Sequence, residues 1–240
     1  MKIIVCENYE EMSKQGAEVI AELLTAKPDC VLGLATGSTP VGMYKCLSAM
    51  NKEGKITFKD VTSYNLDEYY PLAPDHDQSY RYFMNNNLFY HVDIDLNKTH
   101  VPDGLADDPT AMGKAYDEAI EAAGGIDLQV LGLGPNGHIA FNEPEEELHV
   151  ATHLTGLTES TIKANSRFFA SEDDVPKQAV TMGLGSIMKA KKILVLASGK
   201  AKHDVIVKML EGRITTKVPS TLLLTHPNVI LICDKEAYNG

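Results

Sequence analysis

The stretch that decides the fold is Leu131-Gly-Leu-Gly-Pro-Asn-Gly-His-Ile-Ala-Phe-Asn-Glu-Pro144, in which an apolar run passes into a glycine-rich turn. The apolar run, Asp127–Leu133, is typical of a strand buried on both faces of a parallel sheet. The turn then presents Asn136, His138 and Glu143 within eight residues. A histidine and a carboxylate held together by short turns suit proton transfer near neutral pH. We therefore predict catalytic chemistry at the end of this strand.

On both sides of this stretch, short apolar runs alternate with longer segments of helical period, which is typical of a parallel sheet covered by helices. The predicted strands are Lys2–Cys6, Cys30–Ala35, Val61–Leu66, Asp127–Leu133, Ile193–Ala197 and Val229–Cys233. The predicted helices are Glu10–Ala26, Pro40–Met50, Tyr80–Phe89, Ala111–Ala122, Glu159–Phe169, Gly185–Ala190 and Ala201–Leu210. The prediction is an α/β fold: one domain over residues 1–240, with an open, mostly parallel, Rossmann-like sheet flanked by helices on both faces.

Composition narrows the classes of partner. A formal net charge of −11 argues against nucleic acid or an anionic membrane as a partner. The four cysteines are widely spaced, which is typical of reduced thiols in a cytoplasmic protein. No apolar run is long enough for a membrane span. The histidines show no HxxxH or HxH spacing with carboxylates, so the sequence predicts no metal site.

The segment Thr36-Gly-Ser-Thr-Pro40 follows the predicted strand Cys30–Ala35 and resembles an anion cradle. Thr39 is a good N-cap, Pro40 suits the first helical position, and Gly37 lets backbone N–H groups approach a phosphate. An ordinary capped turn would have the same sequence. Lys200, after the predicted strand Ile193–Ala197, places a positive charge on the same rim if the strands are parallel. This shared rim favours phosphate.

Asp67 and Glu68 follow the predicted strand Val61–Leu66 on that rim. Adjacent residues of an extended chain point in opposite directions, so only one of them is expected to face a site. The alternative is a solvated acidic strand end. Arg167 lies beside two aromatic residues in a predicted helix, and its residue type alone does not distinguish a site from a surface salt bridge.

Four segments resemble the glucosamine-6-phosphate deaminase (isomerase) family, in the family's order and over nearly the whole chain. They are Leu32-Gly-Leu-Ala-Thr-Gly-Ser-Thr-Pro40, Asn65-Leu-Asp-Glu-Tyr69, Gly137-His-Ile-Ala-Phe-Asn-Glu-Pro144 and Ala164-Asn-Ser-Arg-Phe-Phe169. The resemblance implies conversion of glucosamine 6-phosphate and water into fructose 6-phosphate and ammonium, with no organic cofactor and no metal. The expected partner is a small sugar phosphate.

The resemblance also implies roles for individual residues. His138 would open the sugar ring, with Glu143 and Asn136 completing the relay, and Asp67 would take the C2 proton. The phosphate would be held by a set drawn from three segments: Gly37, Ser38, Thr39, Arg167 and Lys200. A mobile lid is expected at about residues 157–180, which would carry Arg167 onto the substrate.

Two departures from the family's pattern matter. Residue 136 is an asparagine where some relatives have an aspartate, and an amide cannot stabilise an imidazolium by charge. After the Asn-Glu-Pro run the chain has Glu145-Glu-Glu147, which would repel the phosphate of the effector that activates the hexameric members. We therefore expect no such activation, and a monomer or small homo-oligomer.

Two rival functions remain in view. A 6-phosphogluconolactonase would share the fold and the glycine-histidine turn, but the run Phe141-Asn-Glu-Pro144 favours the deaminase. A non-catalytic sugar-phosphate sensor would carry a DNA-binding domain, for which the acidic balance is unfavourable.

Overall fold

A parallel sheet forms the centre of the molecule. The computed structural model describes residues 1–240 except 167–168, 170 and 172–173, and it does not describe the side chains of residues 160, 164 and 165. Within the described residues, seven strands form this sheet in the order β1-β10-β9-β6-β2-β3-β5, and every neighbouring pair is parallel. The strands are β1 (Lys2–Cys6), β2 (Val31–Leu34), β3 (Thr62–Asn65), β5 (Thr99–His100), β6 (Leu128–Gly132), β9 (Ile193–Ala197) and β10 (Val229–Asp234).

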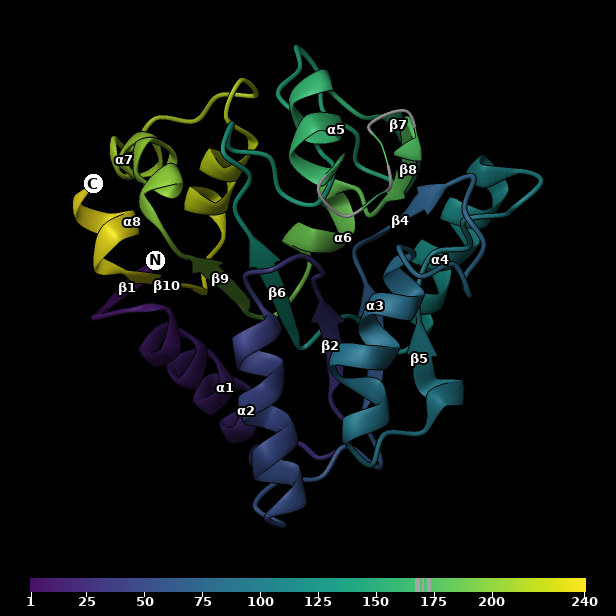
Figure 1. The fold of residues 1–240 in the computed structure, drawn as a ribbon, viewed down its shortest axis with the longest axis vertical. Helices are drawn as coiled ribbons and strands as arrows, with labels where there is room; N and C mark the ends of the chain where they lie inside the picture. Colours follow the sequence, from purple (N-terminus) through teal and green to yellow (C-terminus); the bar gives the residue numbers. More distant parts are fainter. Residues whose placement is uncertain (167–168, 170, 172–173) are drawn as a thin grey trace.

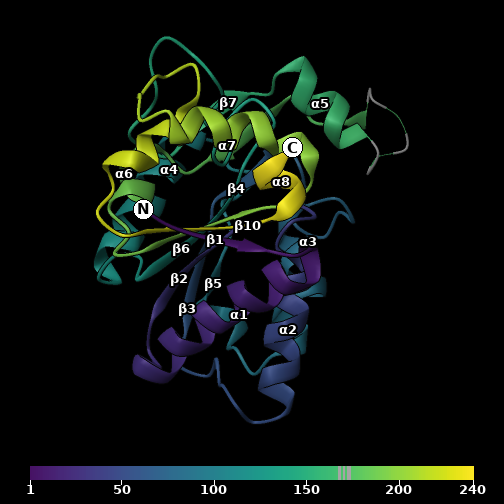
Figure 2. The same ribbon diagram turned by 90° about the vertical axis from the view of Figure 1, so that its left-hand side faces the viewer.

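Helices cover both faces of the sheet (Figure 2). One face carries α1 (Tyr9–Ala26) and α2 (Val41–Lys52), and α3 (Tyr80–Asn87) packs beside α2. The other face carries α4 (Pro109–Ala122), α6 (Leu184–Met188) and α7 (His203–Leu210), while α8 (Lys235–Asn239) follows β10. All residues of β2 and β9 are buried, because helices exclude water from both sides. The predicted fold class is confirmed.

A second, smaller sheet lies at the end of the molecule toward which β6 and β2 run (Figure 1). It consists of β4 (Asp67–Tyr70), β8 (Gln178–Thr181) and β7 (His153–Gly156), paired antiparallel in the order β4-β8-β7. The helix α5 (Glu159–Asn165) lies between β7 and β8 in the chain. This sheet was not predicted, because its strands have four residues each and no clear alternation of apolar and polar residues.

The start of α2 differs from the prediction. The helix begins at Val41, and Pro40, not Thr39, is its N-cap, with no side chain capping it. The reason is that the Pro40 carbonyl already accepts the first helical hydrogen bond, from the Tyr44 backbone N–H at 2.9 Å. The predicted helix Glu159–Phe169 is also shorter, ending at Asn165. Among the helices of the described residues, none has the length and apolar character needed to cross a membrane.

Candidate active site

Four of the segments singled out in the sequence lie at one edge of the central sheet. Because all the strands are parallel, their carboxyl ends share one rim, and ligands of such sheets bind there. The strand order β9-β6-β2-β3 makes these segments neighbours: Ser198–Lys200 follows β9, Gly134–Glu143 follows β6, Thr36–Pro40 follows β2, and Asp67 follows β3. The prediction that they share a rim is confirmed. In Figure 1 this rim faces α5 and the small sheet.

The turn after β6 brings His138 and Glu143 together. Gly137 has φ +90°, a conformation that favours glycine, and the Gly134 backbone N–H donates to the His138 carbonyl at 3.0 Å. His138 Nδ1 lies 3.2 Å from Glu143 Oε1. The two atoms are within ion-pair distance, although Nδ1 has no hydrogen-bond partner of good geometry among the described residues.

The Glu143 carboxylate is buried and receives hydrogen bonds on both oxygens. Asn136 Nδ2 donates to Oε2 and Thr161 Oγ1 donates to Oε1, each at 2.6 Å. Burial acts to raise the pKa of Glu143, but the contact with His138 and these two hydrogen bonds outweigh it and hold the pKa below its usual value. Glu143 is therefore ionised at neutral pH and faces the histidine as a fixed negative charge.

Asn136 contacts both the backbone of His138 and the side chain of Glu143. Its Oδ1 accepts the backbone N–H of His138 at 3.1 Å, and its Nδ2 donates to Glu143. The amide thus fixes the turn and the glutamate, while Glu143 faces the imidazole ring.

The adjacent carboxylates Asp67 and Glu68 are both buried, with 6% and 1% of their surface exposed. Glu68 accepts the backbone N–H groups of Tyr69, Tyr80 and Arg81 at 2.8–3.0 Å, so it holds the start of α3. Burial raises the pKa of Glu68 to about 7, although these hydrogen bonds act against the shift. Glu68 is therefore a structural carboxylate.

Asp67 has no such partners: among the described residues no hydrogen bond reaches its carboxylate. Burial, and then the nearby Glu68, raise the pKa of Asp67 to about 8. An isolated, desolvated carboxylate is a stronger base than one in water. The sequence left open which of the two carboxylates is available for chemistry. The hydrogen bonds that Glu68 accepts occupy its carboxylate, so Asp67 is the available one.

Asp67 and the histidine turn are held in register by the small sheet. Asp67 of β4 pairs with Thr181 of β8, and the Thr181 hydroxyl accepts the backbone N–H of Phe141 at 3.0 Å. The segment that joins His138 to Glu143 is therefore attached to β8, which pairs with the strand that carries Asp67.

The predicted cradle has the backbone geometry of an anion site. Gly37 has φ +85°, and a Cβ built there would meet no atom within 4 Å, so the loop is open on that side. The uncapped N-terminus of α2 supplies N–H groups and a positive dipole end. Tyr9, which the sequence did not single out, shapes the loop: its hydroxyl donates to the Ser38 carbonyl at 3.0 Å and accepts the Gly42 N–H at 2.8 Å.

Lys200 is exposed and opens the short 3₁₀ turn Lys200–Lys202 after β9. The turn before it is held by Asp234, a buried carboxylate at the end of β10. Asp234 accepts a short hydrogen bond from Ser198 Oγ and the Gly199 N–H at 3.1 Å. Nothing local in the sequence links Asp234 to this turn, because Ser198 and Gly199 lie more than thirty positions away from it.

We predict that Asp234→Ala raises KM for a phosphorylated substrate about tenfold with little change in kcat, because the Lys200 turn loses its anchor while the groups around His138 are untouched. Steady-state kinetics measure this, with thermal melting to confirm folding. Glu236→Ala, which removes an exposed carboxylate from α8, is the matched control. Unchanged KM in Asp234→Ala would show that the turn holds without its anchor.

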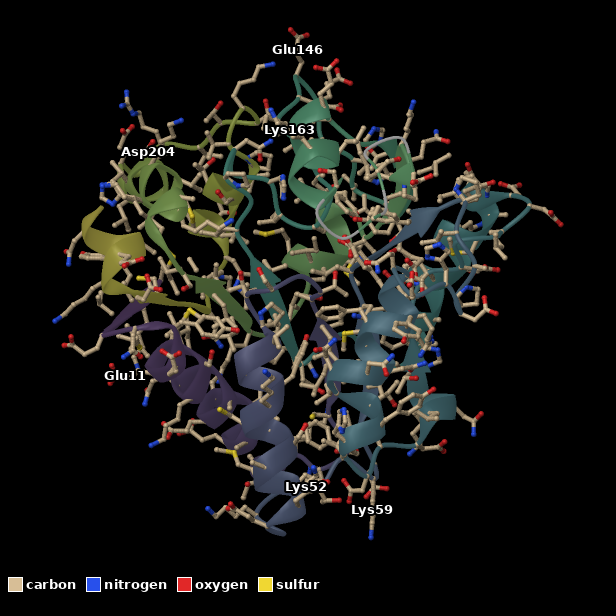
Figure 3. The ribbon with its side chains drawn as sticks, viewed as in Figure 1. Glu11, Lys52, Lys59, Glu146, Lys163 and Asp204 are labelled. Carbon is tan, nitrogen blue, oxygen red and sulfur yellow. The ribbon has the colours of Figure 1, made fainter. Side chains whose placement is uncertain are left out.

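Two expectations concern the lid segment and its surroundings. Arg167 lies outside the described residues, so its predicted contact with phosphate stays a prediction. The residues Glu145–Glu147 are exposed, and Figure 3 shows Glu146 projecting from the end of the molecule that carries α5. Among the described residues, no group of three or more histidine, cysteine, aspartate or glutamate side chains is arranged to hold a metal ion.

Known proteins resemble the chain over nearly its whole length. Residues 7–231 match the sequence profile of a family described as glucosamine-6-phosphate isomerases/6-phosphogluconolactonase. A glucosamine-6-phosphate deaminase of Clostridium perfringens is 61% identical over 99% of this chain and 98% of its own length. One of Thermoanaerobacter pseudethanolicus is 56% identical over 99% of this chain and 94% of its own length.

Solved structures agree with these relatives. A monomeric glucosamine-6-phosphate deaminase superposes with a TM-score of 0.96 at 42% identity, over 99% of this chain and 98% of that one. A 6-phosphogluconolactonase from Trypanosoma cruzi superposes with a TM-score of 0.77 at 24% identity, over 98% and 95%, which shows a common fold alone. The chain belongs to the glucosamine-6-phosphate isomerase/6-phosphogluconolactonase family.

Proposed function

We propose that the protein is a glucosamine-6-phosphate deaminase, which converts glucosamine 6-phosphate and water into fructose 6-phosphate and ammonium. The observation that carries the proposal is the pairing of two different carboxylates on one rim. Glu143 is kept ionised beside His138, whereas Asp67 is desolvated without a hydrogen-bond partner among the described residues. Separating the pKa values of two carboxylates by their environments is how one site assigns different proton-transfer roles.

The proposed chemistry uses each group in turn. His138, oriented by Glu143, takes the proton of the C1 hydroxyl and gives one to the ring oxygen, so that the C1–O5 bond breaks and the pyranose opens to the aldehyde. Asp67 removes the C2 proton of the open-chain sugar, and the resulting enolamine is protonated at C1. Water then replaces nitrogen at C2, which releases ammonium and leaves the ketose phosphate. Hydrolysis of the carbon–nitrogen bond therefore follows isomerisation.

The phosphate would lie over the carboxyl ends of β2 and β9. The Gly37–Thr39 loop offers backbone N–H groups at the start of α2, and Lys200 adds a point charge. Arg167 would complete the site with a planar bidentate contact when the lid closes, within the segment of about residues 157–180. The whole chain, residues 1–240, would act as one catalytic domain with this lid.

The test is release of ammonia and fructose 6-phosphate from glucosamine 6-phosphate, with chelator present and no added metal. Equal amounts of the two products are expected. An assay with 6-phosphogluconolactone is run beside it. Hydrolysis of the lactone without ammonia release would make the protein a lactonase, and ligand-induced thermal protection without turnover would make it a sugar-phosphate sensor.

We further propose that the protein works as a monomer or small homo-oligomer without activation by an acetylated sugar phosphate. The exposed carboxylates of Glu145–Glu147 support this, since they would repel a second phosphate. The superposition on a deaminase described as monomeric is consistent with it.

A further inference from the structure

We infer that Thr161 of α5 is a positioning residue for the Glu143–His138 pair, so that the reactive orientation of Glu143 depends on α5 being in place. The inference rests on the proposed function for its kinetic consequence. Its structural basis is the hydrogen bond of 2.6 Å from the Thr161 hydroxyl to Glu143 Oε1, the oxygen that faces His138 Nδ1.

Glu143 is fixed by donors from two separate elements. Asn136, in the turn after β6, holds Oε2, and this turn also carries His138. Thr161 holds Oε1 from α5, eighteen positions further along the chain. If Asn136 were the only donor, the carboxylate could rotate about the hydrogen bond between Asn136 Nδ2 and Glu143 Oε2. The other oxygen, Oε1, would then move relative to the imidazole. The second donor removes this freedom, which is what precise placement of a catalytic pair requires.

The direction of the Thr161 hydroxyl is set within α5. Thr158 is the N-cap of the helix, and its Oγ1 accepts the Thr161 backbone N–H at 3.3 Å. The Thr158 hydroxyl also donates to Thr161 Oγ1 at 3.0 Å. A hydroxyl has a single proton, so Thr161, which already accepts from Thr158, donates its own proton to Glu143. The helix start therefore aims a donor at the carboxylate.

The charged groups around Glu143 do not replace this donor. His138 faces Oε1 from the turn after β6, but Nδ1 has no hydrogen-bond partner of good geometry among the described residues. On another side a small cavity is lined by Glu143 together with Glu145, Glu147, His149 and His153. Of these residues, Glu145 and Glu147 carry the same charge as Glu143 and repel its carboxylate. The Thr161 side chain is 7% exposed, so water does not substitute for its hydroxyl.

Because α5 lies in the proposed lid segment, its seating and the proton relay are coupled through one hydrogen bond. With α5 in place, Glu143 is oriented and ionised. With α5 displaced, Glu143 keeps the hydrogen bond from Asn136 but loses the one from Thr161, which favours its charged form. The site therefore becomes fully competent when this helix is seated.

The deciding experiment compares Thr161→Val, which keeps the shape but removes the hydroxyl, with Thr161→Ser, which keeps the hydroxyl. For Thr161→Val we expect kcat to fall about tenfold, with KM within about twofold, and the pKa of Glu143 to rise. Thr161→Ser is expected to restore kcat to within about threefold of the wild type. Wild-type kcat in Thr161→Val would overturn the inference.

Glu159→Ala separates this role from the stability of α5. It removes an acidic side chain from the first turn of the helix but leaves Thr158 and Thr161, so it is expected to lower stability without lowering kcat. An equal fall of kcat in Glu159→Ala would mean that Thr161 acts only through the helix, and would also overturn the inference.

A readout without turnover keeps this test separate from the proposed function. Titration of ¹³C-labelled glutamate side chains by NMR, with the Glu143 signal assigned from Glu143→Gln, is expected to show a higher pKa for Glu143 in Thr161→Val than in the wild type. If the wild type does not deaminate glucosamine 6-phosphate, the proposed function fails. The comparison of the Glu143 titration in Thr161→Val and in the wild type still tests the inference. An unchanged Glu143 titration overturns the inference alone.

Discussion

Asp67→Asn is expected to lower kcat for glucosamine 6-phosphate deamination by about 10³-fold or more while making the protein more stable above neutral pH. The first effect follows from loss of the base, since an amide does not take a proton from carbon. The second follows from burial: the native structure holds a carboxylate whose ionised form it disfavours. A site that stores an unfavourable charge gives up stability for function.

The pH dependence of this stability effect has a definite sign. The pKa of Asp67 is raised from 3.8 to about 8 in the folded protein. Below about pH 4 Asp67 is protonated in both the folded and the unfolded state, so its burial places no charge in the core and stability does not fall. Between about pH 4 and pH 8 the unfolded state ionises while the folded state does not, so wild-type stability falls. The asparagine variant does not titrate at this position and escapes that fall.

The expected gain for Asp67→Asn at pH 8 is about 2 kcal/mol, or about 4–8 °C in Tm, because the buried amide offsets part of the benefit. Thermal melting at pH 5 and pH 8, for both proteins, measures it. The same pKa predicts that wild-type kcat/KM rises with pH toward about 8, as free Asp67 ionises. If the difference in Tm between Asp67→Asn and the wild type is the same at pH 5 and pH 8, Asp67 is not the desolvated base. Retained turnover in Asp67→Asn would lead to the same conclusion.

Gly134→Ala is expected to reduce kcat by about 10²–10³-fold with the fold intact. A Cβ at this position would overlap Cδ2, Nε2 and Cε1 of the His138 ring, so the imidazole must swing out of the place it occupies beside Glu143. A displacement of about 1 Å in a proton-transfer group is enough for a loss of this order. The backbone itself tolerates alanine, because Gly134 is not among the glycines with positive φ.

The matched control is Gly132→Ala, at the last residue of β6, two residues before Gly134. A Cβ there would meet no atom within 4 Å, and the backbone φ is not positive, so activity close to wild type is expected. Circular dichroism and thermal melting check that both variants fold. If both variants have wild-type kcat, the ring position seen beside Glu143 is not needed for the reaction. If both lose activity equally, the strand end rather than the ring contact is responsible.

Local sequence was sufficient for the features that depend on neighbours in the chain. The parallel α/β class follows from the apolar runs of β2, β6 and β9 alternating with helices, since a strand covered on both faces must be apolar throughout. The close approach of His138 and Glu143 follows from the glycines of one turn. The shared rim follows from parallel strands, because their carboxyl ends point the same way.

What the tertiary structure decided is which polar groups are free and which are held. Asp67 and Glu68 are adjacent and chemically alike, and only the backbone of α3, twelve and thirteen positions away, takes Glu68 out of the chemistry. Asp234 meets the Lys200 turn, and Thr161 meets Glu143, across 35 and 18 positions. Burial and hydrogen bonds between distant segments set the charge state of a carboxylate, whereas the sequence determines only that the carboxylate is present.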